Sequence, residues 1–186
     1  SEGVDMIMMP THGYGPFRTL LLGSVAPKVL HDAECPVWTA THTEAPPALH
    51  QVDVKTIVCA VDGPLKSGPV VDWAAKFAAV VKAELYLVHA IPVASAWPER
   101  QMNHEYESVL REKAREQIER QMQAANMHAP VHVVNGDVAA AVRKEAVDRS
   151  ADLIIIGRGM LDETLGRLRT HAYSIIRSSP CPVISV

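Results

Sequence analysis

Hydrophobic residues in this chain gather in short runs, separated by longer stretches in which apolar positions recur every three or four residues. The runs at 56–61 and 152–156 are apolar at nearly every position, as expected for strands buried on both faces of a parallel sheet. The stretch at 69–82 has the period of an amphipathic helix. This alternation predicts an α/β fold in which helices cover a parallel sheet.

Between residues 54 and 186 the pattern predicts five strands and four helices. The expected strands are Thr56–Val61, Leu85–Ala90, Val131–Val134, Asp152–Ile156 and Val183–Val186. The expected helices are Pro69–Lys82, Asn103–Ala125, Val138–Arg149 and Thr170–Ser178. The longest helix has one apolar stripe and charges of alternating sign elsewhere, which favours a solvated face over a partner surface.

The end of the chain repeats its beginning. The segment Val4-Asp5-Met-Ile-Met-Met-Pro10 matches Ala151-Asp152-Leu-Ile-Ile-Ile-Gly157, and Cys35-Pro36-Val37 matches Cys181-Pro182-Val183. The offset is 147 residues from Asp5 to Asp152 and 146 residues from Cys35 to Cys181. A repeat of such long period indicates tandem domains. We therefore expect a partial domain at 1–40, a linker at 41–53 and a complete domain at 54–186.

The strand expected at Asp5–Met9 should be buried on both faces, which a single helix cannot achieve. We expect that the earlier strands of its domain were lost by truncation or proteolysis, or that another chain provides them. The alternative is that the strand–helix–strand piece docks directly on the complete domain.

A glycine-containing loop follows this first strand, at Thr11-His12-Gly13-Tyr14-Gly15-Pro16, and a helix begins near Gly23-Ser24. Glycines let the backbone approach a phosphate, and a helix N-terminus offers unpaired N–H groups. The loop is therefore a candidate anion site. A turn that binds no ligand remains the alternative.

Together these motifs resemble a known family. The order of motifs in this segment resembles the C-terminal third of a universal stress protein domain. It consists of an aspartate before an apolar run, Thr-His-Gly, a spacer of nine residues, Gly-Ser-Val and then Cys-Pro-Val. The resemblance implies a Rossmann-like sheet of five parallel strands in the order 3-2-1-4-5, with helices on both faces. It also implies an adenine nucleotide, ATP, in the crevice between the first and fourth strands, where the strand order reverses.

The resemblance assigns nucleotide-binding positions in both copies. They are Gly13, Gly23, Ser24 and Val25 in the first copy, and Asp62, Gly136, Gly157 and Thr170 in the second. Pro10 replaces the first signature glycine of the first copy, while Met160 and Arg169 replace glycines of the second. We therefore expect a degenerate site in the second copy, and a better ATP site in the first domain of an intact tandem protein.

A basic cluster lies close to the degenerate loop. It consists of Arg158, Arg167, Arg169 and His171. Guanidinium groups suit phosphate, so the cluster is a candidate anion site. A solvated basic helix start is the alternative that we favour.

Composition narrows the class of protein. The chain has 48% hydrophobic and 21% charged residues and a net charge of −3, so nothing predicts nucleic-acid binding. No apolar run has the length of a membrane span. The three cysteines, Cys35, Cys59 and Cys181, lack metal-type spacing and are expected to be reduced, with Cys35 and Cys181 buried. This usage favours the cytoplasm.

No metal-ligand spacing or nucleophile–base pair predicts an enzyme, so we expect at most a weak ATPase. Two functions remain. One is a non-catalytic stress regulator that binds ATP through its first domain. The other is an ATP-independent interaction module, a homo-oligomer or pseudo-dimer. The family resemblance implies that final strands pair antiparallel, and Val37–Ala40 and Val183–Val186 occupy equivalent places, so one chain could form this contact internally.

Overall fold

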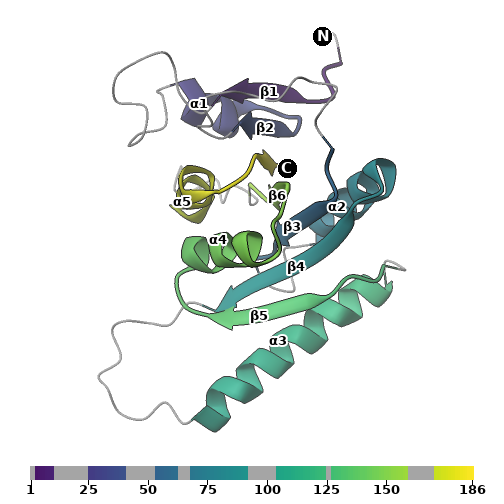
Figure 1. Ribbon diagram of the computed structural model, residues 1–186, viewed down its shortest axis with the longest axis vertical. Coiled ribbons are helices and arrows are strands. Elements are labelled where there is room, and N and C mark those ends of the chain that lie inside the picture. Colours follow the sequence, from purple (N-terminus) through teal and green to yellow (C-terminus); the bar gives the residue numbers. More distant parts are fainter. Residues whose placement is uncertain are drawn as a thin grey trace.

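The computed structural model describes residues 3–10, 25–40, 53–62, 68–91, 104–124, 127–158 and 170–186 of the 186-residue chain. Within these ranges the chain forms one sheet of seven strands, flanked by helices on both faces (Figure 1).

Residues 53–186 contain the predicted strands and helices, with bounds that differ only at the ends. In chain order they are β3 (Thr56–Ala60), α2 (Gly68–Val81), β4 (Glu84–Ile91), α3 (His104–Ala124), β5 (Val131–Asn135), α4 (Val138–Asp148), β6 (Leu153–Ile156), α5 (Thr170–Ser178) and β7 (Val183–Ser185). The strands β5-β4-β3-β6-β7 are neighbours in that order and all pair in parallel. This is the order 3-2-1-4-5, so the prediction is confirmed.

The N-terminal unit consists of β1 (Ile7–Pro10), α1 (Val25–Asp32) and β2 (Val37–Ala40). β1 pairs in parallel with β2, and β2 pairs antiparallel with β7. The unit therefore docks directly on the rest of the chain and extends the predicted five-stranded sheet to seven strands. The antiparallel contact between the two final strands, which the family resemblance implied, is present within this one chain.

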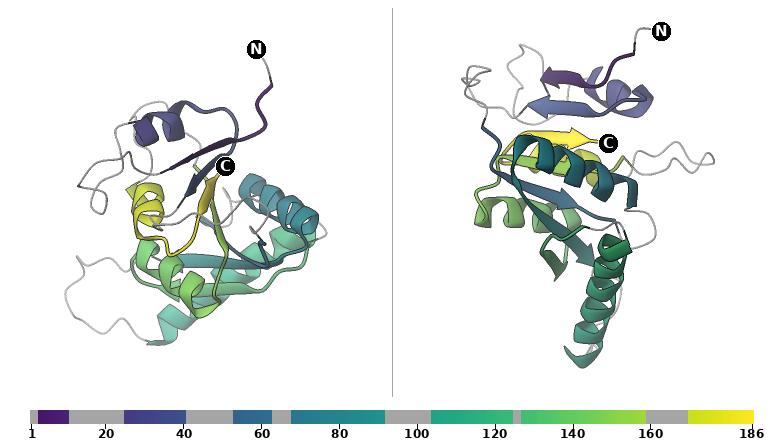
Figure 2. Two further views of the ribbon diagram at one scale, coloured as in Figure 1. Left: turned by 45° about the horizontal axis from the view of Figure 1, so that its top comes forward. Right: turned by 90° about the vertical axis from the view of Figure 1, so that its right-hand side faces the viewer.

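Two apolar clusters lie on opposite faces of the sheet. One contains α1, α4 and α5, and the other contains α2 and α3 (Figure 2). All four residues of β6 are buried. Ile154 and Ile156 belong to the first cluster, whereas Leu153 and Ile155 belong to the second. A strand that is apolar at successive positions is thus covered on both sides, as its pattern predicted.

Two expectations about packing are corrected. Ile118 and Met122 of α3 are buried as predicted, but Val109, on the same predicted stripe, is 44% exposed. Cys35 is partly exposed although its counterpart Cys181 is buried.

Candidate functional site

The strand order reverses between β3 and β6. From β3 the chain moves outward to β4 and β5, and then crosses to β6 and β7 on the other side. Asp62 follows β3, and Gly157 follows β6. Because Ala60 pairs with Ile156, continuing the register places Gly157 beside Val61, next to Asp62. The structure thus brings two predicted site residues together at a reversal point, the place where ligands bind in open α/β sheets.

Gly157 lies against the first turn of α2. A Cβ at this position would stand 3.6 Å from the Cβ and Cγ1 atoms of Val70, which is van der Waals contact. The bare backbone therefore brings the end of β6 close to the start of α2, where a helix has unpaired N–H groups. Because a Cβ would fit here in ordinary contact, packing against Val70 does not by itself require glycine at position 157.

Gly136 stands at the same edge of the sheet, after β5. Its N–H donates to the carbonyl of Ile91 at 3.0 Å, and its φ of +134° is one that glycine adopts most readily. The next residue, Asp137, caps α4 by accepting a hydrogen bond from the N–H of Ala140 at 2.8 Å. Gly136 is thus required for the turn into α4.

His89 supports the end of β3 from the neighbouring strand. Its Nδ1 lies 2.9 Å from the carbonyl oxygen of Val61. A carbonyl can only accept, so Nδ1 carries the proton in this contact. His89 is therefore a hydrogen-bonded residue at this edge of the sheet.

The structure describes only some of the remaining predicted site residues. Val25 is the first residue of α1 and is 64% exposed, and Thr170 is the first residue of α5. Gly13, Gly23, Ser24, Met160, Arg167 and Arg169 lie outside the described residues. The glycine loops of both copies, and most of the predicted linker, therefore stay predictions.

Arg158 directs its side chain away from the crevice. Its guanidinium donates to the carbonyl oxygens of Ala33 and Cys35, the latter at 2.7 Å, and reaches that of Leu30 at 3.4 Å. These carbonyls close the C-terminal end of α1, where a cation is favourable. Burial lowers the pKa of the Arg158 guanidinium. Arg158 is therefore neither an anion ligand nor a solvated residue, which corrects both interpretations for this one member of the basic cluster. Arg167 and Arg169 lie outside the described residues, and His171 is exposed.

A second contact ties the two ends of the chain together in the same region. The hydroxyl of Tyr173 in α5 donates to the carbonyl of Pro27 in α1 at 3.3 Å. With Arg158, it holds the N-terminal unit against residues that are more than a hundred positions away in the sequence.

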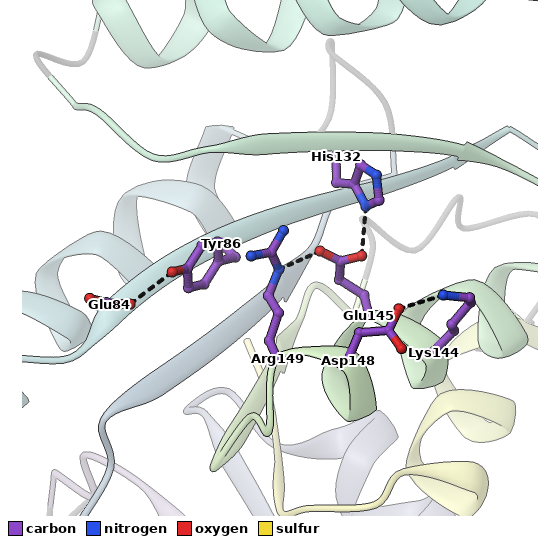
Figure 3. Close-up of polar contacts among 7 residues, drawn as sticks. All are labelled: Glu84, Tyr86, His132, Lys144, Glu145, Asp148 and Arg149. Atoms are coloured by element: carbon purple, nitrogen blue, oxygen red, sulfur yellow. Dashed lines mark hydrogen bonds and ion pairs between the residues drawn. The ribbon is translucent and has the colours of Figure 1, made fainter.

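A buried carboxylate forms a further cluster that the sequence did not reveal (Figure 3). Glu145 of α4 is only 5% exposed and contacts both Nδ1 of His132, at 2.6 Å, and the guanidinium of Arg149. That guanidinium lies 3.9 Å from the centre of the Tyr86 ring, and Tyr86 donates to Glu84 at 2.7 Å.

The cluster lies near the amino ends of β4 and β5, because Tyr86 and His132 are early in their strands. The crevice lies at the opposite, carboxyl edge. The cluster thus joins α4 to the sheet and does not face the candidate site. The spacing of Glu145 and Arg149, four residues apart on one helix, was the signal available in the sequence.

Within the described ranges, no three or more His, Cys, Asp or Glu side chains form a group able to hold a metal ion. The helices of those ranges include none with the length and apolar character needed to cross a membrane.

Solved structures with the same fold include larger proteins. A functionally unassigned protein from Pseudomonas aeruginosa PAO1 is similar, with a TM-score of 0.70 and 19% identity over 100% of this chain and 63% of that one. A universal stress protein from Archaeoglobus fulgidus DSM 4304 has a TM-score of 0.60 and 25% identity over 97% of this chain and 60% of that one. The chain thus spans less than two thirds of the length of these proteins.

A universal stress protein in complex with cAMP has a TM-score of 0.51 and 23% identity, covering 72% of this chain and 97% of that one. No curated protein matches the chain. The model of the universal stress protein family matches residues 1–40 and 53–186. Because this match covers nearly the whole chain, the protein belongs to the universal stress protein family.

Proposed function

We propose that this protein is a non-catalytic stress-response regulator that responds to an adenine nucleotide. The observation that carries the proposal is the juxtaposition of Asp62 and Gly157 at the reversal point between β3 and β6. A relative of similar fold is a complex with cAMP, which supports an adenine nucleotide as the ligand class.

In residues 53–186 we expect the nucleoside part of the nucleotide to be bound better than its phosphates. By the family resemblance Asp62 would contact the nucleoside part, but Met160 and Arg169 replace glycines of the family signature. Glycines at such positions let bare backbone approach phosphates. Arg158 adds no positive charge, since its guanidinium is engaged by α1. We therefore infer a weakened phosphate grip and poor affinity for ATP in this copy.

The first copy differs from the second in its phosphate-binding loop. Its loop keeps Gly13, Gly23 and Ser24, so it is the stronger phosphate-binding element of the pair. In a protein that contains a full first domain, changing Gly23 to Arg together with Ser24 to Ala should abolish ATP binding.

Calorimetry with ATP tests the assignment in the 186-residue protein. The double variant Met160→Gly/Arg169→Gly should bind ATP at least tenfold more tightly than the parent protein. Adding Asp62→Ala to that variant should remove the gain. Asp72→Ala, on the exposed face of α2, is the matched control and should leave the gain intact. A restored double variant that still fails to bind ATP would contradict the proposal.

A second function, an ATP-independent interaction module, is favoured by a different observation. β2 and β7 pair antiparallel, with Trp38 opposite Ile184, and this contact needs no nucleotide. In a protein that contains a full first domain, unfolding measured with and without ATP distinguishes the two functions. A regulator that binds ATP is stabilised by it, whereas an ATP-independent module has the same unfolding midpoint in both conditions.

A further inference from the structure

Helix α1 is bonded to both sides of the segment 157–170, which carries the phosphate-binding positions of the proposed function. On one side, the guanidinium of Arg158 donates to the carbonyl oxygen of Cys35, just beyond the C-terminal end of α1, at 2.7 Å. On the other side, the hydroxyl of Tyr173 donates to the carbonyl of Pro27, in the first turn of α1, at 3.3 Å. The N-terminal unit is therefore joined to the complete domain close to where that segment begins and ends.

The backbone and the side chain of Arg158 are held by different parts of the molecule. Its N–H donates to the carbonyl of Val186 at 2.8 Å, within the complete domain. Its guanidinium donates instead to carbonyls of the N-terminal unit, those of Ala33 and Cys35. Because the backbone contact does not involve α1, a movement of α1 leaves Arg158 in place beside Gly157 and removes only the acceptors of its side chain.

A released Arg158 has the position and the chemistry of a phosphate ligand. It directly follows Gly157, at the reversal point between β3 and β6. A guanidinium presents a planar set of N–H donors that matches the oxygens of a phosphate. In the docked arrangement the same donors are turned toward α1, so the charge of Arg158 does not serve the crevice.

The end of α1 also opposes an anion at this place. Carbonyl groups at the C-terminal end of a helix carry partial negative charge, and the carbonyls that accept from Arg158 belong to this end. Asp32 and Glu34 add exposed carboxylates to the same turn. A phosphate and the end of α1 are therefore rivals for one guanidinium and repel each other.

We propose that α1 is an autoinhibitory element of the crevice between β3 and β6. While α1 is docked, it withdraws Arg158 from the phosphates of the nucleotide, and when α1 moves away, Arg158 binds them. The inference rests on the nucleotide-binding function proposed for this crevice. By linkage, α1 and the phosphates each weaken the binding of the other by the same factor.

The competing explanation is a purely structural one, in which Arg158 only fastens the N-terminal unit to the complete domain. The two explanations differ in what they say about the nucleotide. A structural fastening makes the affinity for ATP independent of α1, whereas autoinhibition makes ATP and α1 antagonists.

The test uses the Met160→Gly/Arg169→Gly variant of the 186-residue protein, in which ATP binding should be measurable. Tyr173→Phe is added to this variant, because the change removes a contact with α1 and leaves Arg158 intact. Calorimetry should find that ATP binds about threefold more tightly or better, the factor expected from the loss of one hydrogen bond that opposes binding. Adenosine has no phosphate and should bind with unchanged affinity.

Two further variants on the same background sharpen the readout. Tyr86→Phe removes a tyrosine hydroxyl that donates to Glu84, away from α1, and should leave both affinities unchanged. Adding Arg158→Met to Tyr173→Phe should abolish the gain in ATP affinity, because no guanidinium is left to be released.

A second measurement works in the opposite direction and needs no change in the contacts of α1. Saturating ATP should speed up amide hydrogen exchange in residues 25–40 of the Met160→Gly/Arg169→Gly variant about threefold or more. Saturating adenosine should not. With Arg158→Met added, ATP should leave the exchange of residues 25–40 unchanged.

Two results would overturn the autoinhibition and leave nucleotide binding intact. The first is unchanged or weaker ATP binding in Tyr173→Phe although exchange in residues 25–40 has become faster. The second is unchanged or slower exchange in residues 25–40 with ATP bound, which shows that α1 is indifferent to the nucleotide or supports its binding. If the Met160→Gly/Arg169→Gly variant binds neither ATP nor adenosine, the proposed function itself fails, and the inference fails with it.

Discussion

Thr39 and Ser185 form the same hydrogen bond in opposite directions across the junction between β2 and β7. The hydroxyl of Thr39 donates to the carbonyl of Val183 at 3.0 Å, and that of Ser185 donates to the carbonyl of Val37 at 3.4 Å. Thr39 and Ser185 are 146 residues apart and occupy equivalent places in the repeat. The junction is therefore self-complementary, as is the contact between two subunits related by a two-fold axis.

Both hydroxyls are buried, so removing either should destabilise the junction. Thr39→Val leaves the Val183 carbonyl without this donor and should cost about 1 kcal/mol of unfolding free energy. Ser185→Ala should cost less, because its bond is longer. Urea unfolding measures both. Thr39→Ser keeps the hydroxyl and is the control; equal losses in Thr39→Ser and Thr39→Val would show that the methyl group, not the bond, matters.

Replacing Arg158 should loosen the N-terminal unit. Arg158→Met removes a charged donor from the carbonyls at the end of α1, which should cost roughly 1–3 kcal/mol. Hydrogen exchange should speed up in residues 25–40 and stay unchanged in β3. Arg143→Met, at an exposed position of α4, should alter neither segment. Unchanged exchange in residues 25–40 of Arg158→Met would contradict the role given to Arg158.

Glu145 and Asp148 provide a matched pair of carboxylates on one helix. Glu145→Ala removes the buried partner of His132 and Arg149 and should cost about 2 kcal/mol, since hydrogen bonds to charged groups contribute roughly 1.5–3 kcal/mol. Asp148→Ala removes only the exposed partner of Lys144 and should cost about 0.5 kcal/mol or less. Thermal unfolding measures both, and similar losses would contradict a special role for the buried group.

The thiols should differ sharply in reactivity. Burial raises the pKa of Cys59 to about 12 and that of Cys181 to about 11, so both remain neutral thiols at pH 8, and the thiolate is the reactive form. Cys35 is partly exposed and should be alkylated first. Mass spectrometry after iodoacetamide treatment should find one modification in the folded protein and three after unfolding.

The same shifts should make the protein less stable in alkali. The unfolded thiols lose their protons near the ordinary pKa of 9.0, whereas the folded thiols hold theirs to higher pH. Between these values the unfolded state binds fewer protons, so stability falls as pH rises above 9. Replacing Cys59 with Ala should flatten this decline in urea unfolding measured from pH 8 to pH 10.5. An equally steep decline in the variant would contradict the linkage.

The sheet could be predicted from the sequence because its strands carry their own signal. β3 and β6 are apolar at successive positions, which occurs when both faces are covered. The pairing of β2 with β7 could be predicted for another reason: the family resemblance implies that final strands pair antiparallel, and the repeat identifies β2 and β7 as the two final strands. In both cases a few consecutive residues carry the information needed to predict the strand or its pairing.

The contacts of individual charged groups could not be predicted in this way. The sequence gives Arg158 a charge, but its acceptor carbonyls are more than a hundred residues away and belong to the other copy. Nothing in the sequence indicated that Glu145 is buried and contacts His132, which lies 13 residues away on another element. Cys35 and Cys181 were both predicted to be buried, because each precedes a proline at the start of a strand, but only Cys181 is buried.

The self-complementary junction has a consequence for how the protein assembles. β2 of one molecule can pair with β7 of a second molecule in the same register, which would give a domain-swapped dimer. The pairing within one chain therefore competes with the pairing between chains, and the protein concentration decides which dominates. Residues 41–52 connect the N-terminal unit, which contains β2, to the rest of the chain, which contains β7. A short connection gives two such binding partners an effective concentration for each other on the order of millimolar. The closed monomeric pairing should therefore dominate below that concentration, and deleting part of 41–52 should convert the protein into swapped dimers.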